Sequence, residues 1–120
     1  MSIYQMGAIE ARFADIVWQS EPISSTVLCK TAEKEFGWKK STTYTVLKRL
    51  CEKGILKNEG GTVSSLITKE EFYSHQSERF INDTFGGSLP AFLAAFTTKK
   101  NLTKEEVAEL KRMINEFEEE

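Results

Sequence analysis

Residues 38–56 read W-K-K-S-T-T-Y-T-V-L-K-R-L-C-E-K-G-I-L, and this stretch decides the fold. It predicts a helix that begins near Ser41, whose hydroxyl can cap the free amides, and that runs to Lys53. Gly54 then ends the helix. At about 100° per residue, one side of the helix gathers the residues that should face the core, which are Thr43, Val46, Leu47 and Leu50.

The opposite side of this predicted helix is polar and partly basic. The outward residues are Ser41, Thr45 and Lys48, and those on the flanks are Thr42, Tyr44 and Arg49. In a recognition helix, Ser, Thr and Tyr side chains touch base edges, while Lys and Arg meet phosphates or guanine. The pattern therefore suits contact with DNA, although an ordinary solvated helix face would look the same on this helix alone.

Charge is unevenly distributed along the chain. The net charge is −2, but residues 1–70 hold ten Lys and Arg against eight Asp and Glu, whereas residues 71–120 hold six against ten. Between residues 38 and 57 a single acidic residue, Glu52, accompanies Lys39, Lys40, Lys48, Arg49, Lys53 and Lys57. A local basic face is what phosphate contact requires, because the binding energy comes from that face and not from the overall charge.

Two short segments with β character follow Gly54, separated by Gly60 and Gly61. A Gly-Gly pair is typical of a hairpin turn, because glycine adopts positive φ without steric cost. We predict that this hairpin is a wing lying along the DNA backbone, and that Lys57 and Thr62 contribute to the contact.

Two further helices precede the basic one. The first spans about residues 7–19, with an apolar face of Ile9, Phe13, Ile16 and Val17. The second is capped by Ser24 or Ser25, ends at Gly37, and should bury Val27, Leu28 and Ala32. Three helices followed by a hairpin make a winged helix-turn-helix. Residues 1–70 are therefore expected to form a DNA-binding domain of that kind.

Residues 71–120 predict a helical dimerisation domain, so the fold class is mainly α with a small β-hairpin. Helices are expected up to Phe85, from Ser88, and from Thr103, which is spaced for a capping box with Glu106. So small a unit can hardly hide its own apolar faces. A second copy should cover them, through Phe80, Ile81, Phe85, Leu89, Phe92, Leu93, Phe96, Val107, Leu110, Ile114 and Phe117. Packing back onto the first domain in a monomer is the alternative.

These segments resemble the penicillinase and methicillin-resistance repressor family over nearly the whole chain. The stretch 38–56 is similar to the family pattern, and IEARFADIVW at residues 9–18 is similar to its first helix, with Glu10 and Trp18 at the expected places. FINDTFGGSL at residues 80–89 and LTKEEVAEL at residues 102–110 resemble the family's dimerisation helices.

The resemblance implies a homodimer that binds an inverted repeat in a promoter and represses transcription, typically of β-lactamase or resistance genes. It also implies a sensor-linked protease as a partner, with cleavage in the dimerisation region at a bond that maps onto Ala95–Phe96. This chain departs from the family pattern in having Ala95 where Asn is usual, and Thr62 and Leu66 where the wing usually has Arg and Tyr. The paired Cys-x-Cys motifs of a copper-responsive branch are not found in this C-terminal segment.

The residue inventory argues against an enzyme or a metal protein. Cys29 and Cys51 stand apart from any Cys-x-x-Cys or Cys/His cluster, and both are expected to be small buried core residues. His75, the only histidine, lies on a predicted helix rather than on a nucleophile turn. We therefore expect no catalytic site, no metal and no cofactor.

No stretch approaches the run of about 20 apolar residues that a membrane span needs. Glu10 and Arg12 interrupt the first apolar residues before a signal-peptide core can form. We expect a soluble, cytoplasmic protein that does not insert into membranes.

Two other functions fit the sequence in part. A winged helix that binds protein is favoured if acidic side chains mask the basic ones, the candidates being Glu33, Glu35, Glu52 and Glu59. DNA is favoured if Lys39, Lys40, Lys48 and Arg49 converge with Ser41 and Thr45. A ligand-responsive regulator would line a pocket with Phe80, Phe85, Phe92 and Phe96, which are more often simple core.

Overall fold

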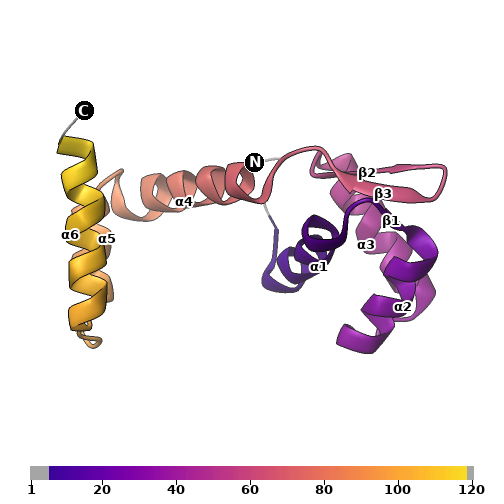
Figure 1. Ribbon diagram of the computed structural model, residues 1–120, viewed down its shortest axis with the longest axis horizontal. Coiled ribbons are helices and arrows are strands. Elements are labelled where there is room, and N and C mark those ends of the chain that lie inside the picture. The colour runs from indigo at the N-terminus through magenta and orange to yellow at the C-terminus, as the bar shows by residue number, and fades with distance from the viewer. Residues whose placement is uncertain (1–5, 119–120) are drawn as a thin grey trace. The chain divides into compact units, whose positions relative to one another are not determined.

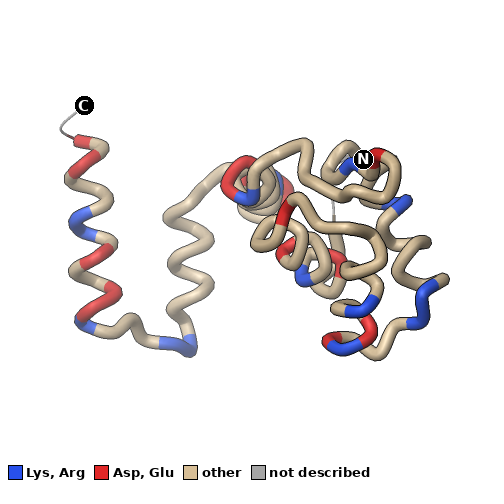
Figure 2. Tube along the Cα trace, turned by 45° about the vertical axis from the view of Figure 1, so that its right-hand side comes forward, with Lys and Arg blue, Asp and Glu red and all other residues tan. Residues whose placement is uncertain are grey.

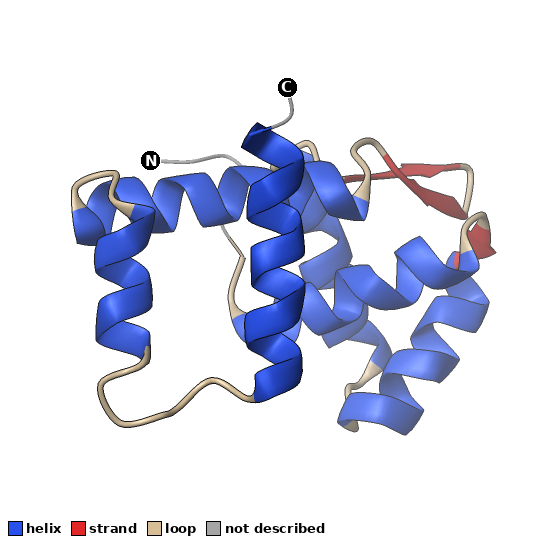
Figure 3. Cartoon of the chain, turned by 60° about the vertical axis from the view of Figure 1, so that its left-hand side comes forward, coloured by secondary structure: helices blue, strands red, loops and turns tan. Residues whose placement is uncertain are grey.

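The computed structural model describes residues 6–118, which are mainly helical (Figure 1). The elements in chain order are α1 (Ala8–Ser20), β1 (Ile23–Ser24), α2 (Ser25–Phe36), α3 (Lys40–Glu52), β2 (Leu56–Glu59), β3 (Thr62–Ser65), α4 (Lys69–Phe85), α5 (Leu89–Phe96) and α6 (Lys104–Glu118). Figure 3 shows the predominance of helix over strand. The expected fold class, mainly α with a small β element, is confirmed.

The chain divides into two compact units, Met1–Glu78 and Arg79–Glu120, which we call the first and the second unit. The division falls inside α4, so the opening turns of that helix belong with the first unit. The boundary between functional domains at residues 70 and 71 stays a prediction.

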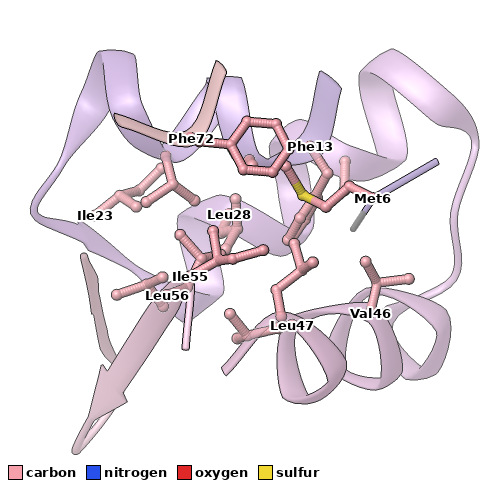
Figure 4. Close-up of a cluster of buried hydrophobic side chains, with 14 residues drawn as sticks. Met6, Phe13, Ile23, Leu28, Val46, Leu47, Ile55, Leu56 and Phe72 are labelled. Atoms are coloured by element: carbon pink, nitrogen blue, oxygen red, sulfur yellow. The ribbon is translucent and has the colours of Figure 1, made fainter. Parts of the chain in front are cut away.

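A continuous apolar core holds the first unit together (Figure 4). Its largest fully buried side chains are Phe13, Phe72, Leu28, Leu50, Ile55, Leu56, Val17, Val63 and Thr43. Burying an apolar side chain of this size stabilises a fold by about 1.5–3 kcal/mol relative to leaving it exposed. Because α1, α2, α3, the strands and the start of α4 all contribute, the core fixes α3 and the hairpin on one rigid scaffold.

Both tryptophans support the core from its edge. The Trp38 ring lies 5.5 Å from Phe13 and 4.8 Å from Phe36 between centroids. The Trp18 ring lies 5.8 Å from Phe72, and its Nε1–H donates a hydrogen bond of 3.0 Å to the carbonyl of Ile67. These side chains anchor the segments that lead into α3 and α4.

The strands form a three-stranded antiparallel sheet in the order β1-β3-β2, with Ser24 paired to Thr62 and Glu59 paired to Thr62 on the other side. Gly60 and Gly61 have φ values of 59° and 91°, which confirms the predicted turn between β2 and β3. The sequence did not predict β1, because a strand of two residues is too short to show alternation.

Two helices begin at serines where the sequence predicted a helix start; for α2 it left Ser24 and Ser25 open as the cap, and the cap is Ser24. Ser24 Oγ accepts a 3.1 Å hydrogen bond from the N–H of Val27, and Ser88 Oγ one of 3.0 Å from Ala91. The capping role assigned to Ser41 is wrong. The helix begins at Lys40, and Lys39 holds the extended cap conformation without a capping side chain, so Ser41 already lies inside the helix.

Several residues expected in the core are more exposed than their spacing suggested. Ile9 is 45% exposed and Val27 is 50% exposed. Val27 lies about 100° around α2 from Leu28, outside the narrow stripe that the core covers. Cys29 and Cys51 are free thiols that are half-buried rather than buried.

The second unit has no comparable core: none of residues 79–118 is buried. Phe80, Phe85, Phe92 and Phe96 contact one another in series, with centroids 5.6–6.1 Å apart. In Figure 2, α5 is drawn without charged positions, whereas α6 alternates acidic and basic ones. Apolar side chains are therefore plentiful in this unit, and each one described is exposed or half-buried.

Candidate nucleic-acid interface

The two sides of α3 are as different as the sequence predicted. Thr43, Val46, Leu47 and Leu50 are buried in the core. Ser41, Thr42, Thr45, Lys48 and Arg49 are exposed on the outer surface. Thr45 Oγ1 donates a 2.9 Å hydrogen bond back to the carbonyl of Ser41, which holds that hydroxyl against the helix. The outer surface of α3 is thus a polar strip on a rigid element.

The basic side chains around this strip differ in their partners. Arg49 Nη1 lies 3.5 Å from Glu10 Oε2, and Lys53 Nζ lies 3.9 Å from the same oxygen. Lys39, Lys40 and Lys48 are exposed and make no ion pair with any residue that the structure describes. Figure 2 shows basic and acidic positions interleaved over the first unit. Three of the predicted lysines therefore keep their charge open to a partner.

Glu10 is a residue that sequence reasoning missed as part of this surface. It was assigned to the first helix, and 39 positions separate it from Arg49. Its other oxygen, Oε1, accepts a 3.2 Å hydrogen bond from the N–H of Gly7. No local sequence signal connects Glu10 to α3, because only the packing of α1 on the scaffold brings them together. Of the acids predicted to mask the basic side chains, Glu59 pairs with Lys57 of the hairpin, whereas the acid that pairs with Arg49 of α3 is Glu10.

Tyr44 lies at the inner edge of the polar strip and is half-buried. Its hydroxyl donates a 3.0 Å hydrogen bond to Ser25 Oγ, the first residue of α2. The sequence predicted a base contact for this hydroxyl and gave no indication of Ser25. In the structure this hydroxyl contacts Ser25 of the same chain, and the predicted base contact stays a prediction.

The hairpin presents Lys57 and Thr62 at its surface. Lys57 Nζ lies 2.7 Å from Glu59 Oε1, and this hydrogen bond, with the charge of Lys57, lowers the pKa of Glu59. A groove between α3 and the hairpin is lined by Tyr44, Leu47, Lys48, Cys51, Leu56, Lys57, Asn58 and Leu66. Burial and the charge of Glu52 raise the pKa of the Cys51 thiol. Lys48 and Lys57 thus stand on the same groove, and Leu66, 54% exposed, provides an apolar wall.

The residues predicted for dimerisation lie on α4, α5 and α6 of the second unit and in no case are they buried. The most exposed are Phe117 at 75%, Leu89 at 63% and Ile114 at 57%. Ala95 and Phe96 occupy the last turn of α5, and both are exposed. The phenylalanines suspected of lining a ligand pocket contact one another.

Within residues 6–118, no group of three or more His, Cys, Asp or Glu residues is arranged to hold a metal ion. The described helices include none that is both long enough and apolar enough to cross a membrane.

The sequence was compared with those of known proteins, and one family matches. The model of the penicillinase repressor family matches residues 6–116. The chain belongs to the penicillinase repressor family. The match runs through both units, from α1 to α6. The resemblance drawn from residues 9–18, 38–56, 80–89 and 102–110 is confirmed.

Two relatives in this family have low sequence identity to the chain, but each alignment covers more than 90% of both proteins. The methicillin resistance regulatory protein MecI of Staphylococcus aureus strain Mu50 is 24% identical over 116 residues, covering 93% of this chain and 94% of the relative. The penicillinase repressor of Bacillus licheniformis is 26% identical over 118 residues, covering 95% and 92%. The chain is accordingly a member of a family of DNA-binding transcriptional repressors.

Proposed function

We propose that this repressor acts in the cytoplasm as a homodimer that binds a palindromic promoter operator and controls β-lactamase or other resistance genes. The observation that carries the proposal is the polar strip of α3, set on a buried core and accompanied by Lys39, Lys40 and Lys48 without ion pairs to described residues. Each α3 would lie in a major groove, with Lys57 and Thr62 of the hairpin on the adjacent backbone.

The start of α3 adds a further argument for phosphate contact. Its first turn contains no acidic residue, and no side chain caps its amides. Helix N-termini attract anions, because free N–H groups and the helix dipole both favour negative charge. Together with Lys39 and Lys40, this end of α3 suits a DNA phosphate.

The second unit supports dimerisation, because its own helices bury none of its described apolar residues. Phe117, Leu89 and Ile114 are more than half exposed, in a unit without a single buried side chain among the residues described. Exposed apolar area of this kind marks interaction sites. A second copy suits the proposal best, because two α3 helices can then address the two halves of a palindrome.

A winged helix that binds protein is the competing function, and two ion pairs favour it. Glu10 neutralises part of the charge of Arg49, and Glu59 that of Lys57. These pairs are exposed on at least one side, and exposed pairs are worth at most about 1 kcal/mol. DNA phosphates can therefore replace Glu10 and Glu59 as partners of Arg49 and Lys57. Lys48 has no ion pair to a described residue that would have to break first.

The test is binding of the purified protein to its own upstream DNA and to a scrambled duplex across a salt series. We expect tighter binding to the upstream DNA. Lys48→Ala should weaken binding to both duplexes and lower the slope of log affinity against log salt by about 0.9. Lys111→Ala, which removes the same charge from α6, is the matched control and should leave the slope unchanged. Equal binding to both duplexes, or an unchanged slope for Lys48→Ala, would contradict the proposal.

We extend the proposal to control by proteolysis at the Ala95–Phe96 bond, with a sensor-linked protease as the partner. Both residues are exposed where α5 ends, and residues 97–103 after them form no regular helix or strand. Mass spectrometry of the protein from cells treated with a β-lactam should reveal fragments 1–95 and 96–120. Induction of the controlled genes while the chain stays intact would refute this extension.

A further inference from the structure

One chain of hydrogen bonds connects the recognition helix to the turn of the wing. Tyr44 of α3 donates through its hydroxyl to Ser25 Oγ at 3.0 Å. The N–H of Ser25 donates to the carbonyl of Gly61, in the turn between β2 and β3, at 2.7 Å. We call these contacts the Tyr44–Ser25–Gly61 link. It joins three segments that are distant in the sequence.

The neighbours of Ser25 in the chain and in space fix its position in the Tyr44–Ser25–Gly61 link. It is 9% exposed and follows directly on Ser24, which pairs with Thr62 in β1–β3 and caps α2 through its hydroxyl. One short segment therefore adds a strand to the wing, begins α2 and receives the Tyr44 hydroxyl. A shift of Ser25 would move the wing turn and α2 together.

The turn itself depends on side-chain support. The N–H of Gly61 donates a 3.1 Å hydrogen bond to Asn58 Oδ1, which closes the turn from the β2 side, and Ser25 holds the same residue from the β1 side. Gly61 has a φ of 91°, and a Cβ there would lie 3.7 Å from Ser25 Oγ. The end of the wing is thus fixed by contacts on both sides, one of which is secured by Tyr44.

We propose that Tyr44 is a positioning residue that sets the wing turn relative to α3, and not a residue that contacts DNA bases. Tyr44 is half-buried and its one hydroxyl proton is engaged by Ser25 Oγ, so it has no proton to offer a base and only its oxygen remains as an acceptor. The inference rests on the proposed function, in which α3 and the wing touch the same duplex. Operator binding then requires both elements at one spacing, whereas loose binding to random DNA depends mainly on phosphate charges.

The decisive substitution is Tyr44→Phe, which keeps the ring and removes the hydroxyl. Tyr73→Phe on α4 makes the same chemical change in the same unit and is the matched control. In the full-length protein without DNA, amide hydrogen exchange at residues 61–64 should accelerate about fivefold for Tyr44→Phe, the order of one lost hydrogen bond. Exchange in α1 and in the buried part of α3 should not change, and Tyr73→Phe should leave residues 61–64 unaffected.

Binding supplies the second readout. Tyr44→Phe should weaken binding to the upstream duplex about 3- to 10-fold and binding to the scrambled duplex less than twofold, without changing the salt slope. Ser25→Ala should reproduce both effects, and the double variant should be no worse than either single one, because all three remove the same contact.

Each other outcome overturns the inference. Weaker operator binding with unchanged exchange at residues 61–64 would make Tyr44 a direct DNA contact. Faster exchange throughout the first unit would mean that Tyr44 contributes to overall stability and not specifically to the position of the wing. Additive losses of affinity in the double variant would mean that Tyr44 and Ser25 act independently. If the wild-type protein does not distinguish the two duplexes, the proposed function fails, while hydrogen exchange without DNA still decides whether the link holds the wing.

Discussion

The first and second units solve the problem of apolar surface in opposite ways. The first unit buries Phe13, Leu50 and Phe72 completely, around a core to which every one of its helices contributes. The second unit buries nothing among residues 79–118, although it contains a series of contacting phenylalanines. The difference teaches that one unit has a packed core of its own, whereas the other has none among the residues described and would gain cover in the proposed dimer. Three predictions test this contrast.

The largest effect is expected for Phe13→Ala in the first unit. Phe13 is 0% exposed and contacts the Trp38 ring, so its loss leaves a cavity that the surrounding helices cannot close. The free energy of unfolding of the first unit, measured in urea by tryptophan fluorescence, should fall by about 3–5 kcal/mol. A loss below about 1 kcal/mol would show that the first unit does not depend on this core.

The next effect concerns the second unit and should appear only in association. Phe117→Asp places a charge on a side chain that is 75% exposed in the single chain. By light scattering at micromolar concentration we expect the wild type to be a dimer and the variant a monomer. The dimer dissociation constant should rise at least about 30-fold, the order of one central interface residue. Urea unfolding of the first unit should change by less than about 0.5 kcal/mol.

Asn115→Asp is the control for this variant, because it adds the same charge on the opposite side of α6. It should leave the dimer intact. A Phe117→Asp protein that stays dimeric would remove α6 from the interface, and a wild type that is already monomeric would remove the whole proposed interface.

The smallest effect tests whether local hydrogen bonds, rather than a core, shape the second unit. Thr103 and Glu106 cap α6 reciprocally, with hydrogen bonds of 2.9 and 3.0 Å. The backbone N–H and then the hydroxyl of Thr103 lower the pKa of Glu106 below its ordinary 4.5. A carboxyl group with a lowered folded-state pKa stabilises the fold above its unfolded pKa and loses that contribution as the pH falls through the folded value. The cap should therefore hold at neutral pH and open below about pH 4.5.

This titration can be followed at the Thr103 amide by NMR. Its chemical shift should move with a midpoint below 4.5 in the wild type. Glu106→Gln should keep the neutral-pH shift and abolish the titration, because glutamine fills a capping box without ionising. A wild-type midpoint at or above 4.5 would mean that the cap does not form in solution.

The sequence predicted best what depends on local pattern. Spacing or residue type alone predicts the two sides of α3, the Gly60–Gly61 turn, a serine cap for α2 at Ser24 or Ser25, a helix start at Ser88 and the capping box of Thr103 with Glu106. The family resemblance was carried by such local segments as well. The structure and the family match confirm these predictions because periodicity and turn chemistry act within a few residues.

What the sequence missed depends on contacts between distant segments. Glu10 against Arg49 and Ser25 against Tyr44 join residues 39 and 19 positions apart, and β1 exists only because β3 lies beside it. For the same reason the sequence predicts a DNA contact for Tyr44: the pattern shows its position on the helix but not Ser25, the partner of its hydroxyl. The expected dimer residues and DNA contacts stay predictions for the experiments above.

Among the described residues, Phe72 is the last one that is buried, and it lies near the start of α4. The next residue, Tyr73, still contacts the rings of Trp18 and Phe72, but none of residues 79–118 is buried. A substitution among residues 79–118 therefore removes no fully buried side chain, and it should disturb packing less than a change at Phe13 or Leu50. Ala95, exposed in the last turn of α5, is one such position.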